Sequence, residues 1–372
     1  MARLGDIATY INGYAFKPSD WSNDGVPIIR IQDLTGNSYQ ANRYSGEYAS
    51  KYEVNDGDVL ISWSASLGVY IWSGEKAVLN QHIFKVVFDK VKVNKSFFVH
   101  QVKNILEKAS SEAHGATMKH LTKPIFDSLP FYLPSMEEQE KIASVLDKIN
   151  MLIFNREQQL SKLDELVKSR FVEMFGDETG LNNWPCCTVG DVADVCVGVV
   201  IKPTQYYADT GIPAFRSLNI GEMRVKDSDW VYFTEEGYQK NQKSVIRKND
   251  VLVVRSGAPG TACVATEEYD GYNAVDIIIA HPDQSKVNSV FLAAFTNMPH
   301  GMNQIRAKTG GAAQQHFNVG GYKAIRLIMP SLELQNQFAA FVEQTDKSKL
   351  AIQKSLEQLE TLKKSLMQQY FG

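Results

Sequence analysis

LPSMEEQEKIASVLDKIN, residues 133–150, is the most informative stretch of this chain, because its pattern returns as MPSLELQNQFAAFVEQTD at residues 329–346. Each copy has a Pro-Ser pair followed by glutamate in the next turn and then by glutamine. A serine with acidic residues just after it is typical of the N-terminus of a helix. The sequence therefore predicts that one helix starts after Ser135 and a matching helix starts after Ser331.

The repeat extends far beyond these two stretches. Residues 115–176 align with residues 311–372 without a gap, at a constant offset of 196 residues. Further upstream, GDIA at 5–8 returns as GDVA at 190–193, and DVLI at 58–61 returns as DVLV at 250–253. The offset changes in between, as expected where insertions fall in loops. A repeat of roughly 180 residues is too long for a solenoid, so the chain is a duplicated domain. Two similar surfaces suit a two-fold partner, and duplex nucleic acid is the leading candidate.

The composition is that of an ordinary globular protein with more than one domain. The chain has 372 residues, of which 44% are hydrophobic and 22% are charged, enough to bury a substantial core. The formal net charge of −3 argues against a simple stand-alone DNA-binding protein. Any nucleic-acid binding must then rely on locally placed charge or on a partner.

The sequence also bears on compartment and metal content. It has no apolar run long enough to span a membrane, and its start lacks the apolar core of a signal peptide. The four cysteines all lie in the second half and form no Cys-x-x-Cys pair. We therefore expect a reduced cytoplasmic protein that has no zinc site and does not contact a membrane.

The globular parts are expected to mix strands and helices. Short apolar runs bounded by turn formers predict strands, and longer amphipathic runs predict helices. Predicted strands cover residues 27–31, 58–63, 84–88, 251–254 and 275–280, and predicted helices cover residues 97–109 and 289–295.

Beyond each Pro-Ser pair, apolar residues recur with the four- and three-residue spacing of a coiled-coil seam. The seam positions are Ile142, Leu146, Ile149, Ile153, Leu160, Leu163, Val167 and Met174 in the first copy, and Phe338, Val342, Ile352, Leu356, Leu359, Leu366 and Tyr370 in the second. Each helix of about 40 residues would be about 60 Å long. We expect the two helices to pair antiparallel, because so long a seam needs a partner. The alternative is that each helix packs only on its own globular domain.

Several motifs carry a family resemblance. GATMKHLT at 115–122, the segment 126–134 and EEQEKIA at 137–143 closely resemble the end of a target recognition domain and the helix that follows it. That arrangement is found in the specificity (S) subunit of type I restriction–modification enzymes. GAAQQHF at 311–317 and PSLELQ at 330–335 repeat it, and WP at 184–185 before VGDV resembles the usual opening of such a domain. The chain departs from the pattern in its shortened first opening and at Leu334, which stands in place of a glutamate.

The resemblance implies an α+β fold with a pseudo-two-fold internal repeat. Two tandem mixed α/β target recognition domains would be separated by two long helices that form an antiparallel coiled coil. The expected boundaries are 1–134 for the first recognition domain and 135–178 for the central helical spacer. The second recognition domain would cover 179–330, and the C-terminal helical spacer 331–372.

The resemblance also implies a function and partners. Each recognition domain would read one half of a bipartite site in double-stranded DNA, and the helices would set the unread spacer. Two methyltransferase (M) subunits and restriction/translocase (R) subunits are the implied partners. The chain would bind no cofactor itself, with S-adenosylmethionine and ATP on the partner subunits.

The residues themselves give no catalytic constellation. The chain has no Pro-Pro dipeptide for an adenine methyltransferase loop, and SGAPG at 256–260 lacks the lysine of a phosphate-binding loop. Asp58 and Asp250 are better explained as strand starts than as nuclease carboxylates. A two-headed scaffold that binds proteins but no DNA, and a self-contained site-specific nuclease, remain alternative functions.

The duplication separates two kinds of candidate DNA-binding residue. Polar residues shared by both copies suit phosphate contacts or the scaffold, whereas residues that differ at equivalent positions suit base reading. The shared pairs are Lys17 with Lys202, Arg30 with Arg216, Ser64 with Ser256 and His120 with His316. The divergent pairs are Trp63 with Arg255, Met118 with Gln314 and Lys119 with Gln315. The alternatives are surface cations or ion pairs within a domain for the basic residues, a structural histidine, and a core position for Trp63.

Overall fold

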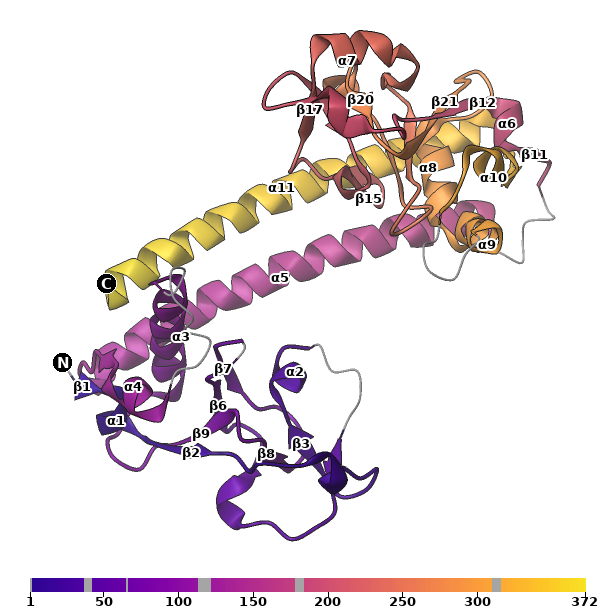
Figure 1. Ribbon diagram of the computed structural model, residues 1–372. Helices are drawn as coiled ribbons and strands as arrows, with labels where there is room; N and C mark the ends of the chain where they lie inside the picture. The colour runs from indigo at the N-terminus through magenta and orange to yellow at the C-terminus, as the bar shows by residue number, and fades with distance from the viewer. Residues whose placement is uncertain (1, 37–41, 65, 113–121, 178–183, 310–315) are drawn as a thin grey trace. The chain divides into compact units, whose positions relative to one another are not determined.

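The computed structural model describes residues 2–36, 42–64, 66–112, 122–177, 184–309 and 316–372 (Figure 1). The chain divides into two compact units. The first unit combines Met1–Glu157 with Lys354–Gly372, and the second unit is Gln158–Gln353. Over the described residues, no helix has both the length and the apolar character needed to cross a membrane.

The first unit contains two four-stranded sheets in its described part. One has the order β2-β9-β6-β7, with β2 Thr9–Asn12, β9 Ile83–Val87, β6 Val59–Ser62 and β7 Gly68–Ile71. The other has the order β4-β3-β8-β5, with β4 Arg43–Tyr44, β3 Val26–Ile29, β8 Ala77–Leu79 and β5 Glu53–Val54. A short pair, β1 Ala2–Arg3 with β10 Pro130–Phe131, completes the described strands of this unit.

The second unit has corresponding sheets. One has the order β12-β21-β18-β19, with β12 Ala193–Val197, β21 Ile277–Pro282, β18 Val251–Val254 and β19 Ala262–Val264. The other has the order β13-β17-β14-β20, with β13 Tyr207–Ala208, β17 Val231–Phe233, β14 Ile212–Phe215 and β20 Asn273–Ala274. Two short pairs are β11 Cys186–Thr188 with β22 Arg326–Ile328, and β15 Ile220–Gly221 with β16 Arg224–Val225.

The central sheets of the two units have the same strand order and are antiparallel throughout. Each second sheet contains one parallel pair at an equivalent place, β3 with β8 and β14 with β20. The duplication that the sequence predicts is therefore a duplication of topology as well.

Each central sheet is buried on both faces. In β18, Val251 and Val253 belong to one core cluster, and Leu252 and Val254 belong to another. Successive side chains of a strand point to opposite faces, so these continuous apolar runs place a core on each side of the sheet. In β6 of the first unit, Ile61 likewise belongs to one core cluster and Leu60 to another.

The shorter helices of each unit lie around these sheets. In the first unit they are α1 Leu4–Ile7, α2 Ile31–Leu34, α3 Lys95–Glu112 and α4 Lys123–Ser128. In the second unit they are α6 Val189–Val192, α7 Glu235–Lys240, α8 Ser289–Asn297, α9 Pro299–Lys308 and α10 Val319–Lys323. Helix α8 lies against β18 and β19.

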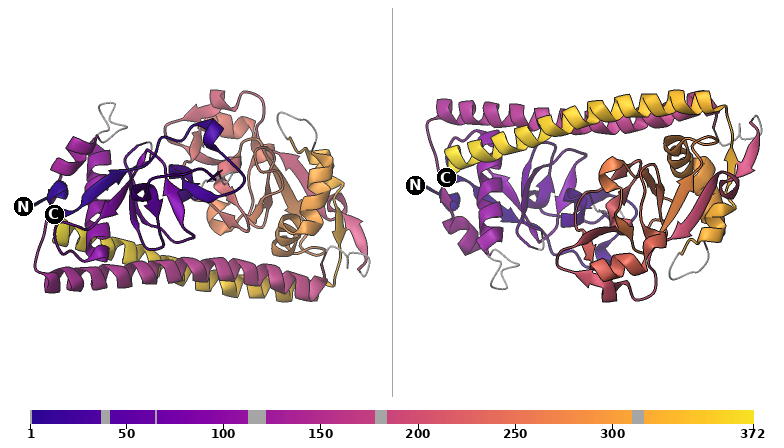
Figure 2. Two further views of the ribbon diagram at one scale, coloured as in Figure 1. Left: turned by 90° about the horizontal axis from the view of Figure 1, so that it is seen from below. Right: turned by 90° about the horizontal axis from the view of Figure 1, so that it is seen from above.

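The two long helices are α5 Met136–Phe175 and α11 Leu332–Phe371, each of 40 residues. In the second unit, Phe171 and Phe175 near the end of α5 pack on Phe338 near the start of α11. About two turns before Phe171 in α5 and about three turns after Phe338 in α11, Asp164 pairs with Lys349 at 2.7 Å. Figure 2 shows these segments side by side. Moving forward along α5 means moving backward along α11, so the pairing is antiparallel, as predicted.

The same direction holds inside the first unit. Ile142 and Leu146, near the start of α5, are buried in the core cluster against which Leu366 and Phe371 of α11 pack. Phe371 also contacts Phe97 of α3, with ring centroids 5.6 Å apart. Each unit therefore contains segments of both long helices, which contradicts the alternative that each helix packs on one domain alone.

A shared glutamine attaches each long helix to its unit. Gln139 accepts a hydrogen bond from the backbone N–H of Asn94 and donates one to the carbonyl of Pro134, both at 2.9 Å. Gln335 makes the equivalent bonds to Asn288 and Pro330, at 2.9 and 3.0 Å. Both glutamines are buried. This explains why both copies have a glutamine at this position, because each glutamine satisfies two backbone groups inside a core.

Other shared residues also serve the backbone. Asp6 and Asp191 accept the N–H groups of Arg3 and Thr188 and thereby cap the helices that start there. Gly13 lies so close to the backbone of residue 80 that a Cβ would approach a carbonyl oxygen to 2.1 Å, which explains why glycine occupies this position.

The largest errors in the predicted strand boundaries are at 27–31 and 275–280. The strand predicted over 27–31 ends at Ile29, because Asp33 accepts the Arg30 N–H at 2.8 Å and starts α2 there. The strand predicted over 275–280 is β21, which starts at Ile277 after Asp276, a residue with φ of 49°. Asp58 and Asp250 do precede strands, accepting the N–H groups of Asn55 and Arg247.

Candidate nucleic-acid interface

In the second unit, three of the predicted residues meet at one end of the central sheet. Arg255 and Ser256 directly follow β18, and a β-bridge joins Ser256 to His316. The Ser256 hydroxyl lies 2.8 Å from Nδ1 of His316, and the Phe317 N–H donates to the carbonyl of Arg255. Segments 60 residues apart in the chain thus form one polar cluster.

An aspartate that the sequence did not single out completes this cluster. Asp276 lies in the turn before β21, and its Oδ1 is 2.6 Å from a guanidinium nitrogen of Arg255. Its other oxygen lies 3.5 Å from the Ser256 hydroxyl. The left-handed backbone of Asp276, with φ of 49°, directs the carboxylate toward Arg255. A lone aspartate before an apolar run gives little sequence signal for this role.

The first unit has an aromatic pair at the equivalent position. Trp63 directly follows β6, and His82 directly precedes β9. Their ring centroids are 5.5 Å apart, and Trp63 also stacks on Phe84. The indole N–H donates to Asn12 at 3.2 Å. Trp63 is partly buried against the core, and the adjacent Ser64 is buried. Trp63 thus combines core packing with a place beside the strand end.

The shared lysines occupy matching loops. Lys17 directly precedes the 3-10 turn Pro18–Asp20, and Lys202 directly precedes Pro203–Tyr206. Both side chains are exposed. Within the part of the chain that the structure describes, neither ammonium group has an ionic or hydrogen-bonded partner. Exposed cations of this kind are available for phosphate oxygens.

The shared arginines are held inside their own units. The guanidinium of Arg30 lies over the Trp21 ring and 3.8 Å from Asp33. Arg216 donates a hydrogen bond to the backbone carbonyl of Asp229. Both arginines are partly buried. Both arginines therefore bind groups of their own domain, which fits the alternative of contacts within a domain better than the prediction of phosphate contacts.

The remaining predicted residues are Met118, Lys119, His120, Gln314 and Gln315, and they lie outside the described residues.

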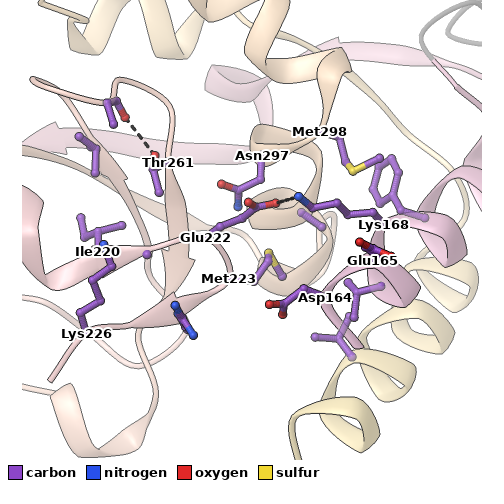
Figure 3. A pocket seen from close by; sticks show the side chains of 18 of the residues that line it. Asp164, Glu165, Lys168, Ile220, Glu222, Met223, Lys226, Thr261, Asn297 and Met298 are labelled. Atoms are coloured by element: carbon purple, nitrogen blue, oxygen red, sulfur yellow. Dashed lines mark hydrogen bonds and ion pairs between the residues drawn. The ribbon is translucent and has the colours of Figure 1, made fainter. Parts of the chain in front are cut away.

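The second unit also has a cavity of about 650 Å³ beside this cluster, with Ser256 at its wall (Figure 3). Asp164 and Glu165 line it from α5, and Glu222 and Lys226 line it from the segment around β16. Lys168 of α5 pairs with Glu222 across it at 2.8 Å. Its wall carries three carboxylates and four cationic side chains, some of which pair with one another. The polar cluster at the strand end remains the candidate for DNA contact, because it holds the side chains that differ between the copies.

The fold and this arrangement define a class of protein. Two copies of one mixed α/β module each place side chains at the ends of a central sheet, and the side chains differ between copies. Among the described residues, no group of three or more His, Cys, Asp or Glu side chains could hold a metal ion. Two such modules with different side chains at equivalent places are the features of a duplicated recognition protein.

The family model for the type I restriction modification DNA specificity domain matches residues 1–165 and 182–363. The chain therefore belongs to this family and contains its domain twice. Proteins of this family are DNA-recognition components, not catalytic ones.

Relatives match over nearly the whole chain. The specificity subunit of the type I restriction enzyme EcoBI from Escherichia coli is 26% identical, over 99% of this chain and 84% of that protein. The MjaVIII specificity subunit from Methanocaldococcus jannaschii is 22% identical, over 99% of this chain and 90% of that protein. The crystal structure of the type I S subunit from M. genitalium has a TM-score of 0.56 and 14% identity, covering 98% of this chain and 94% of that one. That structure supports the fold.

Proposed function

We propose that this chain reads a bipartite site in double-stranded DNA, one half-site with each recognition domain, and brings methyltransferase and restriction subunits to that site. The domains are those expected from the sequence, 1–134 and 179–330, with helical spacers at 135–178 and 331–372. Sequence recognition as such is the role of the family. The two half-sites, the spacer and the composition of the complex are the proposed part.

The observation that carries this proposal is the unequal pair at equivalent strand ends. Arg255 with Asp276 in the second unit corresponds to Trp63 with His82 in the first. The backbone frame is shared while the side chains differ, as expected if each frame reads a different sequence.

The Arg255–Asp276 pair suits the reading of a guanine. An arginine donates two hydrogen bonds to the O6 and N7 of guanine in the major groove. Asp276 binds one side of the guanidinium, which restricts the side chain before DNA arrives. Trp63 offers one N–H, already bonded to Asn12, so the first domain cannot read guanine in this way at that position.

The remaining candidates fall into supporting roles. Lys17 and Lys202 would bind phosphates, which sets register without reading sequence. Ser256 and His316 would fix the loop that carries Arg255. Met118, Lys119, His120, Gln314 and Gln315 keep the roles that the sequence predicts for them, as base or backbone contacts.

The partners follow from the family. Two methyltransferase subunits and restriction/translocase subunits would assemble on this chain, with S-adenosylmethionine and ATP bound by those subunits. The structure of a type I system described in terms of complex assembly has a TM-score of 0.56 to this chain, which supports the fold that such an assembly requires. With a net charge of −3, this chain would need the partners to supply much of the positive charge around the duplex.

The test is to map methylated adenines in cells that produce this chain with its methyltransferase subunit. A single bipartite motif is expected for the unmodified chain. Arg255→Ala should relax one base position in one half of the motif and cost about 1–3 kcal/mol in binding there. The other half and the spacer length should stay unchanged.

Arg224→Ala is the matched control, because Arg224 is an exposed arginine of the same unit. It should leave the motif intact. A motif altered in both halves by Arg255→Ala, or a motif with no second half, contradicts the proposal. DNA cleavage by the chain alone would favour a nuclease, and binding of partner proteins without any DNA binding would favour a scaffold.

A further inference from the structure

Three side chains with complementary chemistry meet on one face of the second unit's central sheet. Cys196 is in β12, His281 is in β21, and Asp250 directly precedes β18. Cys196 pairs with Ile279, so His281, two residues further along β21, is its diagonal neighbour on the same face. This cluster lies apart from the Arg255 strand end and has no role in the proposed function.

The geometry links the three groups in series. Nδ1 of His281 lies 2.6 Å from Oδ1 of Asp250, and Nε2 of the same ring lies 3.7 Å from the sulfur of Cys196. Asp250 is only 2% exposed, and its second oxygen accepts the N–H of Arg247 at 2.6 Å. The thiol and the carboxylate bind opposite edges of the ring and do not converge on a point, so the cluster is unlike a metal site.

The series places a thiol beside an imidazole ring that a buried carboxylate orients. The hydrogen bond that the His281 ring N–H donates to Asp250 raises the pKa of His281 to about 9, with the neighbouring Cys196 contributing in the same direction. An imidazolium at hydrogen-bonding distance stabilises a thiolate, which is the reactive form of cysteine. Cys196 is only half-buried, so a small reagent has access to it.

Two other cysteines lie in less favourable surroundings. Burial raises the pKa of the Cys263 thiol to about 12, and burial together with Asp191 raises the pKa of Cys187. The first unit offers a further contrast, because Ile11 and Val87 occupy the positions of Cys196 and His281. There Asp58 binds Lys85 at 2.9 Å instead. The duplication therefore leaves the cluster in one unit only.

We propose that Cys196 is a reactive thiol that exchanges with small disulfides. The thiol proton passes to water, because His281 is already an imidazolium at neutral pH, and the thiolate beside that imidazolium attacks one sulfur of the incoming disulfide. A new bond forms between Cys196 and that sulfur, and the original S–S bond breaks. The second sulfur leaves as a thiolate and takes a proton from His281 or from water. The products are a mixed disulfide on Cys196 and one free small thiol.

The adduct would disturb a defined contact. The sulfur of Cys196 lies 3.3 Å from the backbone carbonyl of Lys243, in the 3-10 turn Gln242–Ser244. This turn packs on β12 and β20. A group attached to the sulfur must displace the turn, so modification would change the second unit and leave the first unaffected.

The experiment measures the reaction rate of each cysteine in the full chain. The reagents are the chromogenic disulfide DTNB and glutathione disulfide at neutral pH, with the modified peptides identified by mass spectrometry. Cys196 should react at least about tenfold faster than Cys186. Cys196→Ser should remove the fast phase, and His281→Gln should slow Cys196 about tenfold while leaving Cys186 unchanged.

A pH profile of the unmodified chain decides the question even if a variant fails to fold. A thiolate held by an imidazolium keeps its reactivity as the pH falls from 8 to 6, whereas an ordinary thiol loses about tenfold per pH unit below its pKa of about 8.5. A rate at Cys196 that falls in this ordinary way, that equals the rate at Cys186, or that is unaltered in a folded His281→Gln chain overturns the proposal.

Discussion

The two units share their backbone arrangement and differ in the side chains placed on it. Their central sheets have the same strand order, and in each a long helix is held by the same glutamine, Gln139 or Gln335. Yet the aspartate that precedes β6 in the first unit, Asp58, binds a lysine, whereas the aspartate that precedes β18 in the second unit, Asp250, binds a histidine. The pair at the strand end is aromatic in the first unit and ionic in the second.

The difference separates two kinds of constraint. Residues that satisfy backbone groups, such as Gln139 and Asp6, have a fixed partner geometry and are the same in both copies. A residue that binds another side chain, such as Arg255, differs from its counterpart Trp63, and its partner Asp276 differs from His82 as well. The duplicated chain thus retains its scaffold while the pairs of side chains placed on it diverge.

The largest expected difference between the units comes from deleting residues 354–372. The first unit would lose Leu366, Met367, Tyr370 and Phe371, which pack against its core. Burial of each such side chain contributes about 1–2 kcal/mol, so the first unit should lose its cooperative folding. The second unit contains none of the deleted residues. Hydrogen exchange should rise in peptides from 2–112 and stay low in peptides from 184–309; equal protection in both would contradict the division into units.

Replacing the shared glutamines should affect the units equally. Gln139→Ala and Gln335→Ala each leave a backbone N–H and a carbonyl without a partner inside a core. Each variant should lower the free energy of unfolding by about 2–3 kcal/mol. Urea unfolding of both variants measures this, with exposed Gln159→Ala as a control expected to have little effect. A loss in only one of them would mean that the two attachments are not equivalent.

The histidines should give the units opposite pH dependence. The pKa of His281 is raised to about 9 by Asp250, so its contribution to stability is complete below about pH 6.5 and is lost as the pH rises through 9. Burial lowers the pKa of His100 in the first unit, so its stabilising effect is present above about pH 6.5 and is lost as the pH falls.

Denaturant unfolding of His281→Gln and His100→Gln across this pH range measures both effects. His281→Gln should cost on the order of 2 kcal/mol below pH 6.5 and little above pH 9. The native chain should lose stability relative to His100→Gln on the acid side. The same pH trend for both variants would contradict this assignment.

The smallest effect concerns the two lysines that the units share. Lys17→Ala and Lys202→Ala each remove one exposed cation. If both bind phosphate, each variant should weaken DNA binding of the assembled complex equally for all sequences and lower the salt dependence by about one counterion. Filter binding at several salt concentrations measures this. Exposed Lys226→Ala serves as a control, and a changed recognition sequence would contradict the phosphate role.

The sequence predicted those parts of the fold that depend on residues close together in the chain. The serine and glutamates after Pro134 place the start of α5 correctly at Met136, because a cap and its first turn lie within a few residues. The apolar seam predicted antiparallel pairing, because periodicity is also written locally. Strand β3 ends earlier than its apolar pattern predicts, because Asp33 accepts the N–H of Arg30 and starts a helix there.

The candidate site was only partly predictable for the same reason. The comparison of copies pointed to Arg255, but its partner Asp276 lies 21 residues away and is oriented by a left-handed backbone. The link from Cys196 to His281 spans 85 residues. Such pairings arise from strand order, which residue types and spacing did not reveal.

The division of the chain also dictates an order of assembly during synthesis. Residues 354–372 belong to the first unit, whereas the second unit is one continuous segment. Once Gln353 has left the ribosome, all residues of the second unit are available for folding. The core of the first unit is still incomplete at that stage, because Phe97 packs against Phe371, which has not yet emerged. The half that is translated first is therefore completed last. Until those final residues emerge, the nascent protein exposes an unfinished apolar surface at its N-terminal end.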